Sequence, residues 1–307
     1  MKTMTKHFFD FHRLQLVLIW GFIVLFIFYP DVAHSGAETG IALFIKTLLP
    51  YLLPYIILTQ WLLKATTSHT THASTRFLKA YILGAFGGFP VGAVTITEMV
   101  RRGELETKQA SFLLGICHAP GPMFVIGYIG SGLFQSTALG WQLLFAIHFI
   151  NFIFFLVFIL FYNNEQPRTA RNLVVSKNKA DTIPLLASLK ESIPIISLVA
   201  TTVIFFSSLG VVLTNVIADT FTIDTGITET FILALFEMTA GIDSAANHLN
   251  HLTAFPYIVA AILACNGLSI HMQVIAIAKA AKLPVRTYIY LRICSMIFAP
   301  VLFYVMQ

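Results

Sequence analysis

The sequence predicts an all-α polytopic membrane protein, on three observations. The 307 residues are 57% hydrophobic and 11% charged, whereas soluble domains carry about 25% charged residues. Apolar runs long enough to cross a bilayer core of ~30 Å recur along the chain. Nearly all Lys and Arg residues fall between those runs, as in cytoplasmic loops. The 28 Phe residues are scattered through the runs, which argues against a stacking surface for nucleic acid.

Residues 1–40 are expected to form an N-terminal membrane helix and an external loop. Lys2, Lys6 and Arg13 precede an apolar run at residues 14–29, in the manner of a signal peptide. That run is longer than the usual signal core of about 7–15 residues, and further apolar runs follow. We therefore expect an uncleaved first helix whose N-terminus is cytoplasmic.

Two kinds of apolar segment follow. Full crossings are expected at residues 41–63, 111–133, 142–162, 192–216, 255–278 and 287–305. Segments 77–100 and 230–252 instead have an apolar arm, a glycine-containing turn and a more polar return arm. The first arm, 77–86, reaches only ~15 Å at 1.5 Å per residue, about half of the core. These two segments are predicted to be re-entrant helical hairpins.

The charges favour this hairpin model. If both hairpins return to their own side, every basic segment is cytoplasmic and every purely acidic one external. A full crossing at 77–100 would place Arg101 and Arg102 outside, against the positive-inside rule. The model places the protein in a bacterial cytoplasmic membrane with its C-terminus external.

The chain then divides into two repeats of opposite orientation. Residues 41–162 and 191–307 each contain a crossing, a hairpin, a broken crossing and a final crossing, and a polar cytoplasmic linker at 163–190 joins them. Paired broken helices in two halves of a membrane chain indicate a transporter's binding site. The predicted fold is therefore an inverted repeat with two re-entrant hairpins and two broken transmembrane helices.

Four interruptions carry the expected chemistry, at residues 87–92, 117–122, 239–243 and 265–269. Irregular backbone survives in a membrane only where protein or a wet cavity surrounds it. Half-helix N-termini favour carboxylate or phosphate and unwound carbonyls favour Na⁺, so geometry alone leaves the sign of the substrate open. We expect Pro122, Asp243 and Ser269 to begin half-helices. The expected substrate-binding residues are Gly87, Gly88, Phe89, Pro90, Gly92, Cys117, His118, Gly121, Thr239, Gly241, Asn266, Ser269, His271 and Gln273.

Glu98 and Glu237 are the candidate sites for a coupling ion, Na⁺ or H⁺. Placing a carboxylate inside a membrane segment costs free energy, so such a residue is by default a functional candidate. A structural pair with a neighbouring helix is the alternative for Glu237. Glu98 lies close enough to Arg101 and Arg102 for a helical ion pair.

His118 and His271 lie beside the two broken crossings. Each can titrate or bond a carboxylate, or cap the carbonyls of its own break. Arg292 lies near a span end and is expected to snorkel to the membrane surface. The three cysteines show no metal spacing and are expected to be reduced thiols. No metal or cofactor is expected.

At these interruptions the chain resembles the YlbJ-type sporulation integral membrane proteins, within the wider gate-domain (nucleoside-recognition) group. The residues that carry the resemblance are 88–93, 117–124, 237–241 and 267–274. The resemblance implies a fold like that of concentrative nucleoside transporters. It also implies a role in moving dipicolinate toward a developing spore, in the membrane around the forespore if the host sporulates.

The function predicted is a secondary transporter of a small organic anion. The alternatives are a non-transporting membrane protein that binds a ligand or partner during spore or envelope assembly, and a transporter of a nucleoside-like solute. An intramembrane enzyme is not expected, because no metal or nucleophile constellation recurs. The sequence is compatible with a homo-oligomer.

Overall fold

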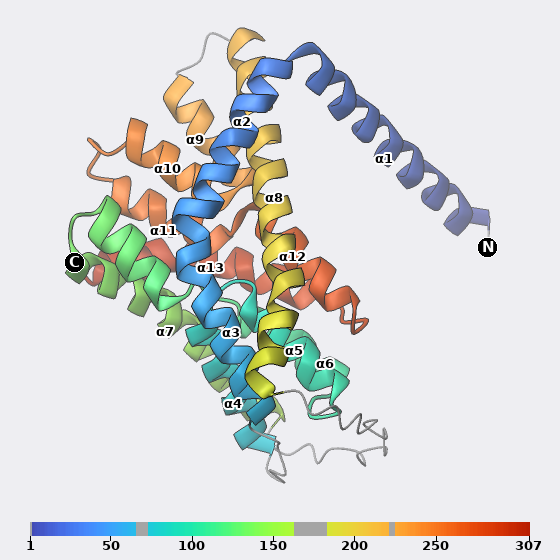
Figure 1. The fold of residues 1–307 in the computed structure, drawn as a ribbon, viewed down its shortest axis with the longest axis vertical. Coiled ribbons are helices and arrows are strands. Elements are labelled where there is room, and N and C mark those ends of the chain that lie inside the picture. Colours follow the sequence, from blue (N-terminus) through green and yellow to red (C-terminus); the bar gives the residue numbers. More distant parts are fainter. Residues whose placement is uncertain (1, 66–72, 163–182, 221–224) are drawn as a thin grey trace.

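Every regular element that the structure describes is a helix (Figure 1). The computed structural model describes residues 2–65, 73–162, 183–220 and 225–307, so most of the predicted linker at 163–190 lies outside the described residues. Within these ranges, five helical stretches are long and apolar enough to cross a membrane: Pro30–Ala65, Thr137–Tyr162, Pro184–Thr220, Phe255–Lys279 and Arg286–Val305. The chain is an all-helical integral membrane protein.

The loop predicted within residues 1–40 is instead helical. After α1 (Lys2–Phe28), which leans away from the bundle in Figure 1, the chain forms α2 (Pro30–Ala42). α2 continues through a π-helical stretch, η1 (Leu43–Leu48), into α3 (Leu49–Ala65). These three elements make one long helix.

Two glycines in α2 allow this helix to pack closely against α8 (Pro184–Thr220). A Cβ on Gly36 would lie 2.8 Å from Ser208 Cα, and one on Gly40 would lie 2.8 Å from Ile204 Cα. The Ser208 hydroxyl also donates to the Ala33 carbonyl over 2.6 Å. Small residues let membrane helices approach closely. Gly36 and Gly40 therefore form the contact between α2 and α8.

The two segments predicted as hairpins are pairs of short packed helices. α4 (Ala73–Gly87) turns into α5 (Val91–Arg101), and α9 (Thr225–Phe236) turns into α10 (Met238–His248).

Both predicted broken crossings are also interrupted. α6 (Thr107–Ile116) ends before η2 (Phe124–Leu133), and α11 (Phe255–Cys265) ends before α12 (Gly267–Lys279). Unbroken helices α7 (Thr137–Tyr162) and α13 (Arg286–Val305) follow them.

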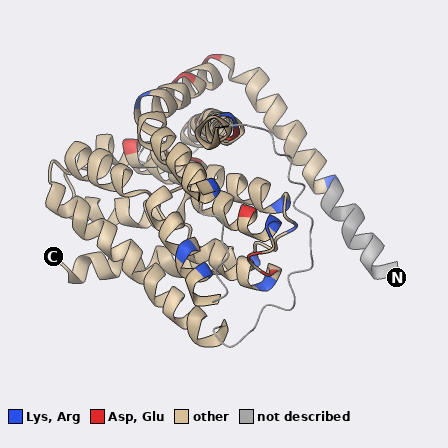
Figure 2. Ribbon diagram, turned by 60° about the horizontal axis from the view of Figure 1, so that its bottom comes forward, with Lys and Arg blue, Asp and Glu red and all other residues tan. Residues whose placement is uncertain are grey.

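The two halves of the chain pack against each other. α13 contacts α6 and α7, α12 contacts α5, and α8 contacts α3. One buried apolar cluster extends across both halves, while large apolar side chains such as Phe161 and Val301 are exposed on outer faces. Figure 2 shows that charged residues are sparse along the helices and gather mainly near their ends. An apolar exterior over a packed interior is the arrangement that a bilayer requires.

Candidate functional site

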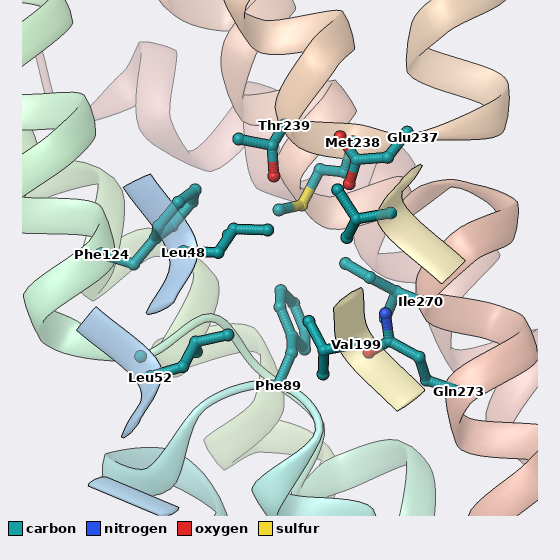
Figure 3. Close-up of a pocket in the computed structure, with 12 residues that line it drawn as sticks. Leu48, Leu52, Phe89, Phe124, Val199, Glu237, Met238, Thr239, Ile270 and Gln273 are labelled. Carbon is teal, nitrogen blue, oxygen red and sulfur yellow. The ribbon is translucent and has the colours of Figure 1, made fainter. Parts of the chain in front are cut away.

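A small cavity lies between the two helical hairpins (Figure 3). It is lined by Leu48, Leu52, Phe89, Gly121, Phe124, Val199, Val203, Glu237, Met238, Thr239, Ile270 and Gln273. These residues come from the α4–α5 turn, the α6–η2 break, the α9–α10 junction and α12, together with η1, α3 and α8. Its volume is about 30 Å³, the share of one water molecule in the liquid. The cavity is too small in this conformation for an organic solute and must widen to admit one.

The tip of the first hairpin rests on the break between α6 and η2. Gly88 has a φ of +71°, which only glycine adopts readily. A Cβ at this position would lie 2.6 Å from the Gly121 backbone nitrogen. The next residue, Phe89, directs its ring into the cavity (Figure 3).

Three residues predicted to line the site pack behind this tip instead. A Cβ on Gly92 would collide with the Cys117 carbonyl, and one on Gly87 would collide with Val91. Cys117 is buried and does not line the cavity. These residues allow close backbone packing, which sequence spacing alone does not distinguish from ligand contact.

The second hairpin is interrupted at Glu237, whereas the sequence predicted residues 239–243. Those five residues are helical and belong to α10. A Cβ on Gly241 would collide with the Ala234 backbone, so this glycine serves the contact between α9 and α10. The expected cap, Asp243, lies inside α10 and does not begin it.

The second broken helix turns at Asn266 and Gly267, with φ values of +78° and +66°. Ser269, predicted as a cap, lies inside α12, and its hydroxyl donates to Glu237 Oε1 over 3.4 Å. A Cβ on Gly267 would lie 3.0 Å from the Met238 backbone nitrogen. In both halves, therefore, the hairpin tip rests on the helix break that follows it in the sequence.

Glu237 is the one carboxylate among the residues that line the cavity, and its side chain caps the N-terminus of α10. Its Oε2 accepts a hydrogen bond from the Ala240 N–H over 2.6 Å. The residue is 1% exposed, and no Lys, Arg or His of the described residues forms an ion pair with it. The donors around it are a helix N-terminus and hydroxyls, which favour a carboxylate but leave its charge uncompensated.

Gln273 and Thr239 add neutral polar groups to the cavity. Gln273 Nε2 donates to the Thr202 hydroxyl over 2.8 Å, linking α12 to α8. Thr239 is fully buried and lies beside Glu237 in Figure 3. Together with Glu237 they leave a mainly apolar chamber with one acidic end.

A second, polar cavity of about 230 Å³ lies on the other side of the start of α10. Its lining includes Glu229, Asp243, Ser207 and Asn215 and contains no Lys or Arg. The Ser207 hydroxyl is buried without a hydrogen-bond partner. Ala240, whose N–H binds Glu237, lines this second cavity, whereas Glu237, Met238 and Thr239 line the first.

Glu98 does not join the site. Its Oε1 accepts from Arg102 Nε over 2.9 Å in a partly exposed ion pair, and Arg102 also donates to the Leu63 carbonyl. The two residues are one helical turn apart, the spacing at which such pairs form on a helix surface. Of the two alternatives for Glu98, the geometry agrees with the ion pair.

The two histidines lie behind the cavity and do not line it. The fully buried His118 ring lies 4.5 Å from the Phe89 ring and meets Tyr288 edge-on at 5.1 Å. His271 Nδ1 and the Tyr288 hydroxyl lie 2.8 Å apart. Asn266 is also fully buried, and its carboxamide lies near Tyr288 without a hydrogen bond of normal geometry.

Arg292 was expected to snorkel to the membrane surface, and this prediction is wrong. Arg292 is 2% exposed and does not reach the surface. Its Nη2 donates to the Gly115 carbonyl and to Asn151 Oδ1, both over 2.8 Å, so a residue of α13 is bound to α6 and α7. The signal was available, because an arginine within an apolar span is by default a functional candidate.

No group of three or more His, Cys, Asp or Glu residues in the described part of the chain could hold a metal ion.

Comparison with known proteins gives one distant relative. The chain is 21% identical over 154 residues to the sporulation integral membrane protein YlbJ of Bacillus subtilis (strain 168), a stretch that covers 45% of this chain. The alignment spans 38% of the length of that relative. No family model and no solved structure matches the chain. The chain is thus an integral membrane protein with a weak similarity to a sporulation membrane protein.

Proposed function

We propose that this protein is a secondary transporter of a small organic anion. The observation that carries the proposal is the meeting of both hairpin tips and both helix-break regions around one small, mainly apolar cavity with an acidic end. Interrupted helices around a central site are the usual construction of secondary transporters. Alternating access requires elements that move around a fixed site, and the two hairpin tips are the elements proposed to move.

The finer fold is part of this proposal. α4, α5, α9 and α10 contain 15, 11, 12 and 11 residues, so each reaches roughly 16–23 Å at 1.5 Å per residue. None of them alone spans a core of ~30 Å. They are therefore re-entrant hairpins, in an inverted repeat of residues 41–162 and 191–307, with the N-terminus cytoplasmic and the C-terminus external.

The substrate follows from the sequence resemblance and from the similarity to a protein named for sporulation. The resemblance implies dipicolinate as the anion and, in a spore-forming host, the membrane around the forespore as the location. The relative's name supports only a membrane protein of sporulation. The resemblance to the gate-domain group keeps a nucleoside-like solute as the competing substrate.

Glu237 is the proposed site of the coupling ion. A carboxylate and an anionic substrate in one small chamber repel each other strongly at low dielectric, so substrate binding requires a proton or Na⁺ on Glu237. The acid-lined second cavity beside Ala240 supports this, because its Glu229 and Asp243 attract cations. Transport is then symport of the anion with H⁺ or Na⁺.

A non-transporting ligand-binding or assembly protein is the second candidate. The cavity volume of about 30 Å³ is compatible with both candidates, because neither a transported solute nor a bound ligand enters it without movement. Uptake of labelled dipicolinate and of labelled nucleosides into proteoliposomes, by wild type and Glu237→Gln, separates the two. Accumulation driven by an imposed H⁺ or Na⁺ gradient supports transport. Binding of dipicolinate or a nucleoside without uptake, under an H⁺ gradient and under a Na⁺ gradient, would contradict transport.

A further inference from the structure

A buried cluster of polar side chains lies behind Phe89, outside the cavity. We call it the Arg292 cluster, and its members are His118, Asn151, Asn266, Tyr288 and Arg292, all at most 2% exposed. Phe89 is the partition: its ring faces the cavity on one side and lies 4.5 Å from the His118 ring on the other. Movement of that ring would uncover His118, the member of the cluster that it contacts.

The guanidinium of Arg292 has no countercharge in this conformation. It forms none of the ion pairs between described residues, and its hydrogen bonds go to a backbone carbonyl and to the neutral amide of Asn151. Its Nε has no partner. A buried charge held only by neutral acceptors is costly, and removal from water is repaid only by an opposite charge in good geometry.

Four of the six unsatisfied side-chain atoms in the Arg292 cluster are donors, and the two acceptors are Asn266 Oδ1 and one His118 nitrogen. Because Asn151 Oδ1 accepts from Arg292, its Nδ2 carries two N–H groups, and this nitrogen has no partner. Both ring nitrogens of His118 are also buried without a partner, and a neutral ring carries an N–H on one of them. Arg292 Nε, Asn151 Nδ2 and one His118 nitrogen therefore offer N–H groups that lack an acceptor. A carboxylate supplies both the acceptor oxygens and the negative charge, and it matches a guanidinium geometrically.

We propose that Arg292, with Asn151 and His118, binds a carboxylate of the transported anion when Phe89 moves aside. This inference rests on the proposed function and assigns the residues that recognise the charged end of the substrate. Glu237 lies across the cavity from Phe89 in Figure 3. The substrate then lies between a site that neutralises its charge and a carboxylate that takes up the coupling cation.

Two substitutions at Asn151 test the inference in the full-length protein. Asn151→Asp is nearly isosteric and gives Arg292 an internal carboxylate, which competes with the ligand. Asn151→Leu removes the amide but leaves the guanidinium unpaired. The probes are pyridine-2,6-dicarboxylate and its neutral diamide, with affinity measured by calorimetry and folding by the thermal midpoint.

We expect Asn151→Asp to bind the dicarboxylate at least tenfold more weakly than wild type, with an equal or higher thermal midpoint. Asn151→Leu should lose less affinity than Asn151→Asp, although its midpoint falls. Arg292→Lys should retain more affinity than Arg292→Gln, because it keeps the charge. The neutral diamide should bind more weakly than the dicarboxylate to wild type.

Failure of the proposed anion transport and failure of this inference give different results. If wild type binds neither the dicarboxylate nor another carboxylate tested beside it, the proposed anion transport fails, and this inference fails with it. If wild type binds the dicarboxylate and Asn151→Asp binds it within twofold of wild type, the inference alone is overturned. Arg292 would then only tie α13 to α6 and α7.

Discussion

The carboxylate of Glu237 accepts a hydrogen bond from the Ala240 backbone N–H over 2.6 Å while the same side chain lines the cavity. One residue therefore begins α10 and supplies the acidic group of the candidate site. Neutralising its charge would weaken the cap, because a charged acceptor binds an N–H more strongly than a neutral one. If Glu237 is the ion site as proposed, binding of the ion therefore changes the stability of the second hairpin tip.

Two substitutions at Glu237 separate the cap from the charge. Glu237→Gln keeps an oxygen acceptor for Ala240 but removes the charge, so gradient-driven uptake should fall at least tenfold while the fold survives. Glu237→Ala also removes the cap, and its free energy of unfolding should be lower than that of Glu237→Gln by about 1 kcal/mol. Uptake assays and thermal unfolding in detergent measure the two effects. Equal uptake by wild type and Glu237→Gln would exclude Glu237 as the ion site.

Glu98→Gln is the matched control, because it removes a carboxylate that lies outside the cavity. Glu98 lies in a partly exposed ion pair with Arg102 at 2.9 Å and does not line the cavity. Such pairs contribute about 0–1 kcal/mol. We expect uptake within twofold of wild type and a shift in unfolding free energy no larger than that range. A large loss of uptake in a folded Glu98→Gln protein would return this residue to the site.

Gly88→Ala should stop transport. The substitution meets a φ of +71° and a Cβ position 2.6 Å from the Gly121 nitrogen, so the hairpin tip must separate from the α6–η2 break. Gly103→Ala is a matched control, because Gly103 has the same φ of +71° and no atom within 4 Å of its Cβ position. Both variants carry a backbone strain of roughly 1–2 kcal/mol.

If only that strain mattered, the two variants would show the same uptake when reconstituted at equal density. We expect Gly103→Ala to retain uptake and Gly88→Ala to lose it, with both inserted in the membrane. Wild-type uptake by Gly88→Ala would show that the tip contact is not needed for transport.

Gly36→Ala and Gly40→Ala should destabilise the protein. Alanine in place of glycine inside a helix normally stabilises it by about 1 kcal/mol, but here the added methyl group would lie 2.8 Å from a Cα atom of α8. Gly21→Ala, in α1, has no atom within 4 Å and serves as the control. Thermal midpoints in detergent should fall for the first two variants and not for the third. A rise in all three would show that α2 and α8 are not in close contact.

Composition and periodicity determined a large part of this structure. The apolar runs predicted membrane helices where α7, α8, α11–α12 and α13 lie, because crossing a bilayer requires about 20 apolar residues whatever packs against them. The turn at Gly88 and the breaks at residues 117–121 and 266 were also predictable, since proline, or glycine beside a polar residue, disfavours helix locally. These are properties of the chain over a few residues.

Only the tertiary structure decided what each glycine and each charge does. Gly36, Gly40 and Gly241 lie inside helices at points where a neighbouring backbone leaves no room for a side chain. No local sequence pattern reveals that neighbour. Arg292 was expected at the membrane surface because it lies near a span end, yet α13 lies against α6 and α7, which buries Arg292 and gives it acceptors more than 140 residues away in sequence. The enclosure of a charge depends on which helices surround it, and long-range packing alone determines that.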